Sequence, residues 1–395
     1  MRHMFYGALV SGELQRLIDD LADRLEVPIS LEDPNQHLLA SSVQHGTIDD
    51  VRRQTILGRR SLPDVRAWFE AFGVRTALDP VRIPADPAHS ILARLCVPIR
   101  HRDRLIALLW LIDPDLQLGD TELAVIRSVA AHVALLLGQS ELAERMAGDT
   151  FRHLVSPVES SREAARRELT EYGGWSRTAP MVVVVAELSG PTDDDSVDAV
   201  GMALADPARL PTTDALLRFS RAHQASVLTA ARSGPAVAER LLNAMVARLP
   251  GRQVSAGIGD PVSGLADVHH SFRQARRAAH VAATVPNMGP IVRWGDLGVF
   301  RALTLLPADE LGRSALDPRL VQLLVASEPD LVVTLEQYLD LAGDAQATAA
   351  ALHIHRSTLY HRLGRIETIT GTSLRSGGDR LALHLGLKLV KLSAG

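Results

Sequence analysis

The first third of the chain alternates between helical and strand-like patterns of apolar residues. Leucine and isoleucine recur at helical spacing from Leu9 to Leu25, which predicts an opening amphipathic helix. Two strand pairs follow within residues 28–40 and 95–112, each folded about a polar turn, with two polar helical segments between them. The apolar run Leu105–Ile112 is continuous, so it predicts a central strand that is covered on both faces.

A long helix is predicted to end this region. Gly119-Asp120 provides its cap, and apolar residues from Leu123 to Leu137 lie along one stripe. The order of helix, paired strands, helical insert, paired strands and exit helix resembles a GAF or PAS-like α/β sensory domain. We place this domain at residues 1–148, followed by a helical linker at 149–178, and expect the long helix to couple it to a partner subunit. The resemblance implies a small ligand bound against a curved sheet.

Four aromatic residues could line the pocket of such a sensor: Trp68, Phe69, Phe72 and Trp110. Three of them, Trp68, Phe72 and Trp110, are the candidate ligand contacts. The effector they would bind is a small molecule that the sequence does not name. The alternative is that each is an ordinary core aromatic, which for any one of them is about three times as frequent. The single cysteine, Cys96, lies in an apolar strand and is expected to be a buried, inert thiol.

The middle of the chain alternates strands and helices. Strands are expected at Met181–Val185, Ala225–Ala230 and Val254–Gly259, and helices at Val237–Leu249 and Leu265–Ala283. We therefore expect a second α/β domain at residues 179–300, followed by a helical linker at 301–327. The acidic run at 192–195 is expected to be a solvated loop, because consecutive acidic side chains do not point toward one metal ion.

Residues 257–261 and 271–278 resemble the GGDEF-like domain found in the middle of PucR/CdaR-type transcription regulators. True GGDEF domains are nucleotide cyclases, which need an acidic pair holding Mg²⁺ and a glycine-rich turn. Here the strand that would carry the first acid ends at Glu187-Leu188, and the hairpin that would carry the signature reads Arg221-Ala222-His223. Neither glycine nor the acidic pair of that turn is present, so we expect a degenerate α/β domain without cyclase activity.

The C-terminal end has the pattern of a helix-turn-helix. Asp344 is an N-cap for a helix at Ala345–Leu352, and a turn at His353-Ile354 leads to a further helix at about Arg356–Thr368. A small residue before the turn, Ala349, lets the two helices approach, and the apolar residues around it fix their angle. Histidine is tolerable in the tight turn because it is among the non-glycine residues enriched at positive φ.

This region closely resembles the helix-turn-helix signature of the PucR family. The match is carried by Ile354–Leu363 and extends from Thr334 to Leu387. It implies an all-α DNA-binding domain at residues 328–395, whose last signature helix enters the major groove of double-stranded DNA. The candidate DNA contacts are His355, Arg356, Ser357, Thr358, Tyr360, His361 and Arg365. The family usually has Asn where Ser357 stands and an aromatic residue where His361 stands, so its base preference does not transfer.

Each candidate DNA contact suits a particular role. Arg356 is suited to bidentate pairing with guanine, which discriminates between bases by roughly 1–3 kcal/mol. Ser357 and Thr358 suit hydrogen bonds to phosphates or base edges, and the histidines, Tyr360 and Arg365 suit the DNA backbone. The alternative is a helical hairpin that only mediates dimerisation and whose charged face is simply solvated.

Composition narrows the function classes. With 395 residues, 46% hydrophobic and 22% charged, the chain suits two or three globular domains. A net charge of −4 excludes a protein that coats nucleic acid along its whole length. From Leu331 onward, however, seven basic side chains oppose five acidic ones. One cysteine excludes a disulfide framework and a Cys-rich zinc site, and we expect no metal or cofactor.

These observations predict a cytoplasmic transcription regulator of α+β multidomain architecture. No segment reaches the roughly 18 uncharged apolar residues of a membrane span, and the acidic N-terminal stretch does not suit a secretory signal. We expect a one-component, ligand-responsive, sequence-specific DNA-binding protein that is not an enzyme. It would act as a homodimer or higher homo-oligomer, since one small module buries little DNA surface. The alternatives are a protein-binding adaptor and a nucleotide cyclase-related enzyme.

Overall fold

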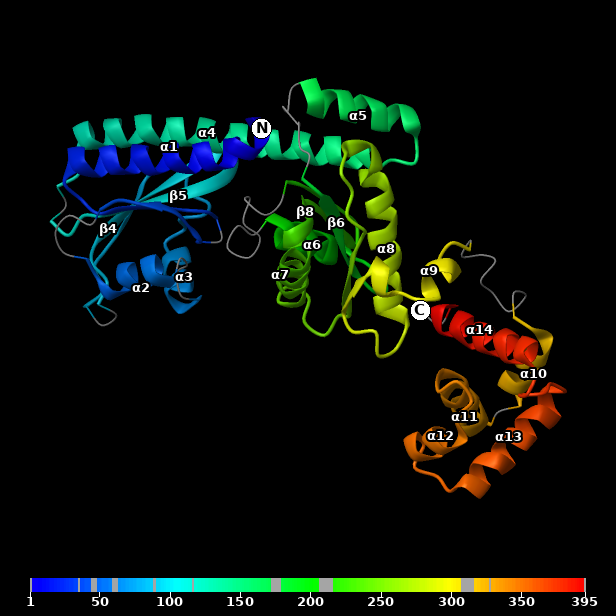
Figure 1. Cartoon of the computed structure of the whole chain (residues 1–395). Helices are drawn as coiled ribbons and strands as arrows, with labels where there is room; N and C mark the ends of the chain where they lie inside the picture. Colours follow the sequence, from blue (N-terminus) through cyan, green and yellow to red (C-terminus); the bar gives the residue numbers. More distant parts are fainter. Residues whose placement is uncertain are drawn as a thin grey trace. The chain divides into compact units, whose positions relative to one another are not determined.

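The computed structural model describes residues 2–393 except 35, 44–47, 59–62, 88–89, 116, 172–178, 206–215, 307–315 and 327. Parts of both expected linkers therefore lie outside the described residues. The chain divides into two compact units, residues 1–151 with 164–176 and residues 152–163 with 177–395. Each unit contains a sheet with helices, and the C-terminal end is all helical (Figure 1). The predicted α+β multidomain class is confirmed.

The first unit is built on a five-stranded antiparallel sheet. Its strands are β1 (Ile29–Glu32), β2 (Leu38–Ser41), β3 (Val81–Ile83), β4 (Arg94–His101) and β5 (Arg104–Ile112). The order across the sheet is β2-β1-β5-β4-β3, so β5 is central, as its continuous apolar run predicts. The two predicted strand pairs are the β1–β2 and β4–β5 hairpins. Strand β3 was not predicted, because three residues are too few to show a period.

Helices cover both faces of this sheet (Figure 1). They are α1 (Arg2–Leu25), α2 (Asp50–Gly58), α3 (Pro63–Glu70) and α4 (Asp120–Leu154), with α5 (Glu159–Glu171) following along the chain. Helices α1 and α4 pack on one face, where Ile18 and Val133 share a core with Leu109. Helices α2 and α3 cover the other face, where Phe69 packs in a second core with Leu108. Successive residues of β5 thus enter two different cores, which explains why its apolar run is uninterrupted.

Helix α4 begins at the predicted cap, Asp120, and continues well past the predicted apolar stripe to Leu154. Among the described residues it is the one helix that is long and apolar enough, by length and composition alone, to cross a membrane. Its Ile126, Val133 and Leu136 are buried in the core of the first unit. We therefore interpret α4 as a helix of that core.

The second unit begins with another five-stranded sheet. Its strands are β6 (Met181–Leu188), β7 (Leu217–Arg221), β8 (Gln224–Ala230), β9 (Val254–Ile258) and β10 (Ile291–Arg293), in the order β10-β9-β6-β8-β7. Helices α6 (Asp194–Ala205) and α7 (Gly234–Val246) share a core with one face of this sheet. Helix α8 (Val268–Thr284) packs on β6 and β9. The predicted strands appear as β6, β8 and β9, and the predicted helices as α7 and α8.

Two glycines allow α8 to lie directly against β9. A Cβ atom at Gly257 would lie 2.0 Å from the carbonyl oxygen of Ala275, and one at Gly259 would lie 2.1 Å from that of Ser271. The Ser271 hydroxyl also accepts a hydrogen bond of 2.9 Å from the backbone N–H of Val183, which ties α8 to β6. The glycines of the segment that carries the GGDEF-like resemblance therefore serve to pack α8 closely against the sheet.

The run at 192–195 is exposed, as a solvated loop would be, but its last two residues begin a helix, so the loop assignment holds only for 192–193. Helix α6 starts at Asp194. The preceding Asp193 carboxylate accepts hydrogen bonds from the backbone N–H and the hydroxyl of Ser196, at 2.8 and 2.5 Å. These hydrogen bonds lower the pKa of the Asp193 carboxyl. Sequence reasoning missed the helix because it did not recognise an aspartate that caps with a serine three residues later.

Helices make up the rest of the second unit. They are α9 (Phe300–Leu303), α10 (Pro318–Val325), α11 (Pro329–Asp340), α12 (Ala345–Ala351), α13 (Arg356–Thr370) and α14 (Gly377–Ser393). Leucines of α10, α11, α13 and α14 form one core, including Leu320, Leu335 and Leu359. The far end of α14 packs elsewhere, where Leu389 shares a cluster with Val281 of α8. Helix α14 thus connects the helical domain to the core beside α8.

Candidate functional site

Helices α12 and α13 form the predicted helix-turn-helix. The Asp344 carboxylate caps α12 by accepting hydrogen bonds from the backbone N–H groups of Gln346 and Ala347, at 2.8 and 3.0 Å. His353 occupies the tight turn with a φ of 53°, the left-handed conformation that the sequence predicts for it. Ala349 is 5% exposed, as expected for the small residue at the crossing of the two helices. The predicted local geometry is confirmed.

Helix α13 begins at Arg356 and ends at Thr370, and the following Gly371 has a φ of 62°, the left-handed conformation typical of a helix C-terminus. Leu359, Leu363 and Ile366 are all buried, so the predicted apolar face of this helix is confirmed. His355 is its N-cap: the Nδ1 atom accepts a hydrogen bond of 3.3 Å from the backbone N–H of Ser357.

All seven candidate DNA contacts lie on the exposed side of the helix-turn-helix. They are His355, Arg356, Ser357, Thr358, Tyr360, His361 and Arg365. The ring of Tyr360 is notable because 54% of this large aromatic residue faces solvent. Arg356 has no ion-pair partner in the part of the chain that the structure describes. The first turns of α13 therefore present a charged guanidinium, hydroxyls and an aromatic ring together.

The arginines farther along α13 are engaged within the protein. Arg365 forms a bidentate contact with the Glu328 carboxylate, with its Nε atom 3.0 and 2.9 Å from the two oxygens. This contact lowers the pKa of the Glu328 carboxyl. Arg362 pairs with the Asp330 carboxylate at 2.7 Å. The sequence shows all these residues as free surface charges, because the acidic partners lie more than thirty positions upstream on another element.

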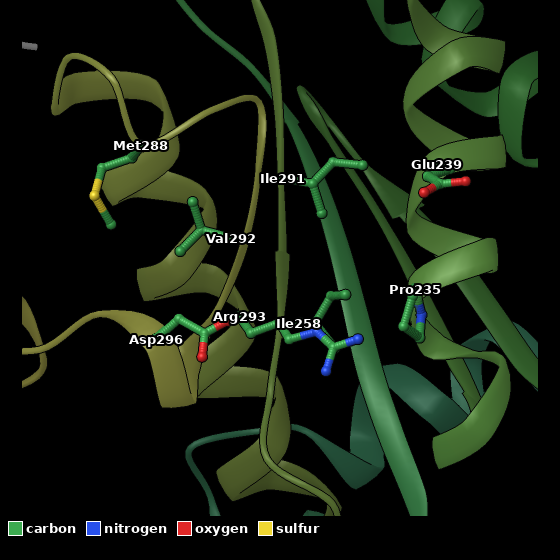
Figure 2. Close-up of a pocket in the computed structure, with 8 residues that line it drawn as sticks. All are labelled: Pro235, Glu239, Ile258, Met288, Ile291, Val292, Arg293 and Asp296. Atoms are coloured by element: carbon green, nitrogen blue, oxygen red, sulfur yellow. The ribbon is translucent and has the colours of Figure 1, made fainter.

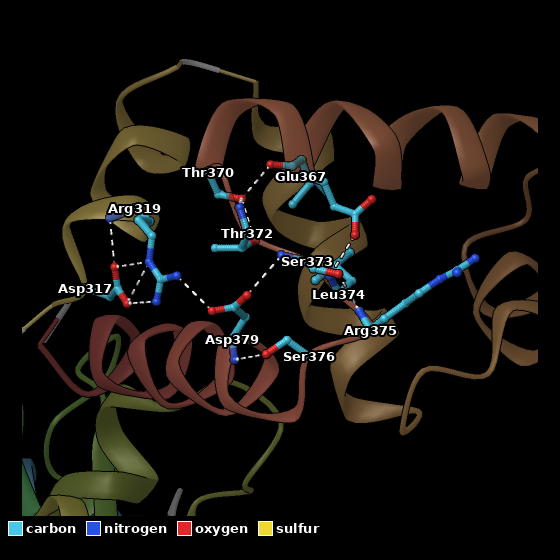
Figure 3. Close-up of polar contacts among 11 residues, drawn as sticks. Asp317, Arg319, Glu367, Thr370, Thr372, Ser373, Leu374, Arg375, Ser376 and Asp379 are labelled. Atoms are coloured by element: carbon cyan, nitrogen blue, oxygen red, sulfur yellow. Dashed lines mark hydrogen bonds and ion pairs between the residues drawn. The ribbon is translucent and has the colours of Figure 1, made fainter.

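A polar network holds the far end of α13 (Figure 3). The Arg319 guanidinium bridges two carboxylates, with Nη2 2.7 Å from Asp317 and Nη1 2.8 Å from Asp379. Asp379 also accepts a hydrogen bond of 3.0 Å from the backbone N–H of Ser373. The Glu367 carboxylate accepts one of 2.7 Å from the N–H of Leu374. These contacts fix the turn between α13 and α14, and no short motif in the sequence indicated them.

The two lysines of the chain are also engaged on α14. The Nζ atom of Lys388 lies 2.7 Å from the Asp340 carboxylate, and Lys391 pairs with Glu336. Lys388 is only 15% exposed at its side chain. These ion pairs therefore support the packing of α14 on α11. The excess of two positive charges counted from the sequence thus overstates the positive charge that this domain presents to an anionic ligand.

The predicted ligand-contact residues of the first unit belong to one aromatic cluster between the sheet and α3. Trp110 on β5 is 2% exposed, and its ring centroid lies 4.7 Å from that of Phe69. Trp68 meets Phe69 at 5.2 Å and Phe72 at 4.9 Å, in edge-on arrangements. Phe69, which the sequence also offered as a pocket residue, contacts both Trp68 and Trp110 and so links them. Cys96 is fully buried in the same cluster, and burial raises the pKa of its thiol.

Buried charged residues lie beside these aromatics and were not predicted. The Arg94 guanidinium stacks 4.9 Å from the ring centroid of Phe69 and pairs with Asp49, both of them almost fully buried. Arg52, which is 2% exposed, donates a hydrogen bond of 3.3 Å from Nη2 to the carbonyl oxygen of Trp110. Burial, followed by the charge of Arg94, lowers the pKa of Arg52 to about 10.

Two donors of this cluster lack a hydrogen-bond partner. They are the Nη1 atom of Arg52 and the Nε1 atom of Trp110. A buried donor without a partner costs roughly 1–3 kcal/mol, so such atoms are usually satisfied by water or a ligand. Among the described residues, this face of the sheet thus combines apolar rings with two N–H groups that are free to donate to an oxygen atom. The partners Asp49 and Arg94 are 45 positions apart, so no local sequence pattern brings them together.

In the second unit, the hairpin between β7 and β8 has no acidic pair in its turn, as the sequence indicates. Its His223 ring nitrogen lies 2.8 Å from the carboxylate of Glu187 at the end of β6. A cavity of about 320 Å³ lies along β9, β10 and α7 (Figure 2). It mixes apolar residues with Arg293 and two carboxylates, those of Glu239 and Asp296, so it has no dominant charge.

Three known domains match the chain in the order that the structure shows. A GAF domain matches residues 14–137, a GGDEF-like domain residues 158–281, and the PucR C-terminal helix-turn-helix domain residues 331–389. Together they define a multidomain transcription regulator with a C-terminal helix-turn-helix. The chain belongs to the PucR/CdaR-type family of these regulators.

Similar proteins cover almost the whole chain. It is 22% identical to the proline-responsive transcriptional activator PutR of Bacillus subtilis, over 96% of this chain and 97% of the relative. It is 23% identical to the purine catabolism regulatory protein of that organism, over 98% of this chain and 73% of the relative. The transcriptional activator PmfR of Paenarthrobacter nicotinovorans is 33% identical over 33% of this chain and 28% of its own.

A solved structure also aligns with part of the chain. It is the regulator of polyketide synthase expression from Bifidobacterium adolescentis, at 18% identity and a TM-score of 0.29, over 62% of this chain and 91% of that one.

Proposed function

We propose that this protein is a cytoplasmic, one-component transcription regulator that binds specific double-stranded DNA through α13 and responds to a small-molecule effector. The observation that carries the proposal is the helix-turn-helix, with Leu359 and Leu363 buried and the polar side of α13 exposed. Functionally we divide the chain into a sensor at 1–148, a GGDEF-like domain at 179–300 and a DNA-binding domain at 328–395.

The first turns of α13 are proposed to carry the base contacts. Arg356 is the residue for bidentate hydrogen bonding to a guanine, because it lies at the N-terminal end of the helix and is not engaged within the protein. Ser357, Thr358, Tyr360 and His361 flank it and suit phosphates or base edges. His355 and Arg365 are proposed to contact the backbone only, and Arg365 must first share or leave its contact with Glu328.

The sensor's ligand is proposed to bind in the aromatic cluster formed by Trp68, Phe72 and Trp110. The two buried donors without partners, on Arg52 and Trp110, favour a ligand that presents oxygen acceptors, as a carboxylate does. The printed names of the relatives agree with a metabolite-responsive activator, since one of them is proline-responsive.

We propose that the protein acts as a homodimer or higher homo-oligomer. A single helix-turn-helix buries little DNA, so useful affinity requires paired half-sites. Helix α4 supports this proposal, because its Leu135 and Leu142 are 56% and 59% exposed, although Val133 and Leu136 of the same helix are buried in the sensor core.

Fluorescence anisotropy with DNA from upstream of its own gene tests the proposal. The wild-type protein should bind this DNA saturably, and Arg356→Ala should weaken specific binding by about 10-fold to 100-fold through loss of a base contact. The matched control is Arg375→Ala, which removes an exposed arginine of the same domain outside α13. Absence of saturable binding, with or without candidate effectors, or an equal loss in both variants would refute the assignment.

A protein-binding adaptor and a nucleotide cyclase-related enzyme are the competing functions. An adaptor would keep its activity when Arg356 and Arg365 are both replaced by alanine, whereas DNA binding would be abolished. An enzyme would form product from GTP or ATP with Mg²⁺, and the basic turn at Arg221-Ala222-His223 argues against it, since it offers no carboxylate pair for the metal.

A further inference from the structure

The GGDEF-like part of the second unit contains a large open cleft that no function has yet been given. Its volume is about 1050 Å³. One wall is formed by residues 152–157 and Arg162, a second by the β7–β8 turn, and a third by the N-terminal half of α8. All the lining residues belong to the second unit.

Positive charge dominates this cleft. Five arginines line it, together with three histidines and without any aspartate or glutamate. The arginines are Arg152, Arg162, Arg221, Arg273 and Arg276. Among the described residues, Arg221, Arg273 and Arg276 have no carboxylate partner, and Arg273 instead donates to the Nδ1 atom of His270 at 2.8 Å. Two carboxylates pair with other cations of the cleft, Glu159 with Arg162 and Glu187 with His223.

The cations of the cleft repel one another. Burial lowers the pKa of His269, and the nearby charges of His270, Arg162 and Arg273 lower it further. Burial also lowers the pKa of Arg277 on the same helix, and here the additional causes are Arg273 and Arg276. Like charges held close together are destabilising, and Arg221, Arg273 and Arg276 have no carboxylate partner among the described residues, so the arrangement favours an anion that neutralises several of them at once.

Aromatic rings form part of the same walls. Phe219 of β7 and Phe272 of α8 have their ring centroids 6.1 Å apart. The Arg152 guanidinium lies 5.8 Å from the Phe219 ring, and that of Arg276 lies 5.9 Å from the Phe272 ring. The arginine side chains are thus held over flat apolar surfaces with their planar donor groups at the cleft, a geometry suited to phosphoryl oxygens.

We propose that this cleft binds a small molecule carrying two or more adjacent phosphoryl groups. Phosphoryl groups supply the high charge density that several arginines can share, and the volume of the cleft lies near the upper end of the range for small-molecule sites, about 300–1,000 Å³. The basic turn between β7 and β8 supplies Arg221 and no acidic pair, so the ligand is held without a carboxylate-bound metal. This goes beyond the proposed DNA binding, since it gives the middle domain a second, separate input signal.

Isothermal titration calorimetry on the full-length protein tests the proposal with three probes: inorganic tripolyphosphate, GTP and citrate. Tripolyphosphate or GTP should bind saturably, and citrate, a tricarboxylate, should bind at least about tenfold more weakly. If GTP binds more tightly than tripolyphosphate, the source is a nucleotide whose base uses the aromatic wall. If the two bind equally, the phosphoryl chain alone is recognised.

Arginine variants locate the site. Arg221→Gln and Arg276→Gln should each weaken phosphate binding by about tenfold or more, as expected for loss of a charge-assisted contact. Arg232→Gln removes an exposed arginine of the same domain outside the cleft and should leave affinity unchanged. The cleft variants should unfold at the same temperature as the wild type or higher, because they relieve repulsion.

Three results would overturn the proposal. The first is no saturable binding of either phosphate probe, and the second is an equal loss in Arg232→Gln. The third is that the cleft variants weaken binding of double-stranded DNA but not of tripolyphosphate, which would make the cleft a DNA contact. None of these results depends on the Arg356 test, so the two proposals fail separately.

Discussion

Replacing Gly257 by alanine should destabilise the second unit, because this glycine sets the distance between β9 and α8. The added Cβ atom would lie 2.0 Å from the carbonyl oxygen of Ala275 and 2.4 Å from the backbone nitrogen of Ala279. Both are backbone atoms of α8, so no side chain can rotate away. Ordinary contact begins near 3.4 Å, so the helix would have to move more than 1 Å from the strand.

The expected loss of stability follows from the packing and the hydrogen bond that such a movement of α8 would disturb. Overpacking a well-packed core costs roughly 1–3 kcal/mol and occasionally more. Moving α8 would also strain the buried hydrogen bond of 2.9 Å from the Ser255 hydroxyl to the Ala279 carbonyl. The net contribution of one hydrogen bond to the free energy of unfolding is about 1 kcal/mol. We therefore expect a loss of about 3 kcal/mol or more, against which the usual gain of roughly 0.4–1 kcal/mol for Gly→Ala is small.

Hydrogen exchange of peptides from α8 and β9, measured at increasing urea concentration, reports the stability of the second unit separately from that of the sensor. Gly257→Ala should lower the urea midpoint of these peptides and leave those of β4 and β5 unchanged. Gly264→Ala is the control, because a Cβ atom there meets nothing within 4 Å. A Gly257→Ala protein as stable as the wild type would show that α8 does not pack on β9 at this distance.

Two further predictions concern the DNA-binding domain. Gly364→Ala should stabilise it by about 0.5–1 kcal/mol, seen as a higher urea midpoint, because Gly364 lies inside α13 with nothing within 4 Å of its missing Cβ. The pKa of Asp379 lies below its ordinary value of 3.8. The main cause is the hydrogen bond from the backbone N–H of Ser373, and the hydrogen bond from Arg319 is the next. Their stabilisation is therefore present above pH 3.8 and lost as the pH falls below it. Asp379→Asn should show a smaller fall in urea midpoint between pH 7 and about pH 3 than the wild type; an equal fall would contradict the assignment.

Sequence patterns predicted the elements whose signals are local. The β4–β5 hairpin, helix α13 and the left-handed turn at His353 each depend on a few adjacent residues and were placed correctly. Strands β3 and β10 are three residues long, too short to show a period, and were missed. The start of α6 was missed because capping by Asp193 is a side-chain interaction that hydropathy does not report.

The sites depend on contacts between distant residues, so the sequence located only part of them. The exposed face of α13 was predictable because helical periodicity separates it from Leu359 and Leu363. The buried pair of Asp49 and Arg94 was not, since its members lie on α2 and β4, 45 positions apart. The arginine-lined cleft of the second unit combines segments near residues 152, 221 and 273, and only the fold brings these arginines together.

The distribution of positive charge explains how a chain of net charge −4 can still bind an anionic ligand. In the DNA-binding domain Arg362 and Arg365 are held in ion pairs, as are both lysines, and Arg319 just before it is also paired. Such pairs add little to long-range attraction, because each cation has a carboxylate within contact distance. Arg356 at the start of α13 is unpaired among the described residues. An anionic ligand is therefore attracted more strongly to the N-terminal end of this helix than to its C-terminal end. Weak non-specific attraction together with the base contact proposed for Arg356 would favour binding to paired half-sites over coating DNA, which is the behaviour expected of the proposed oligomer.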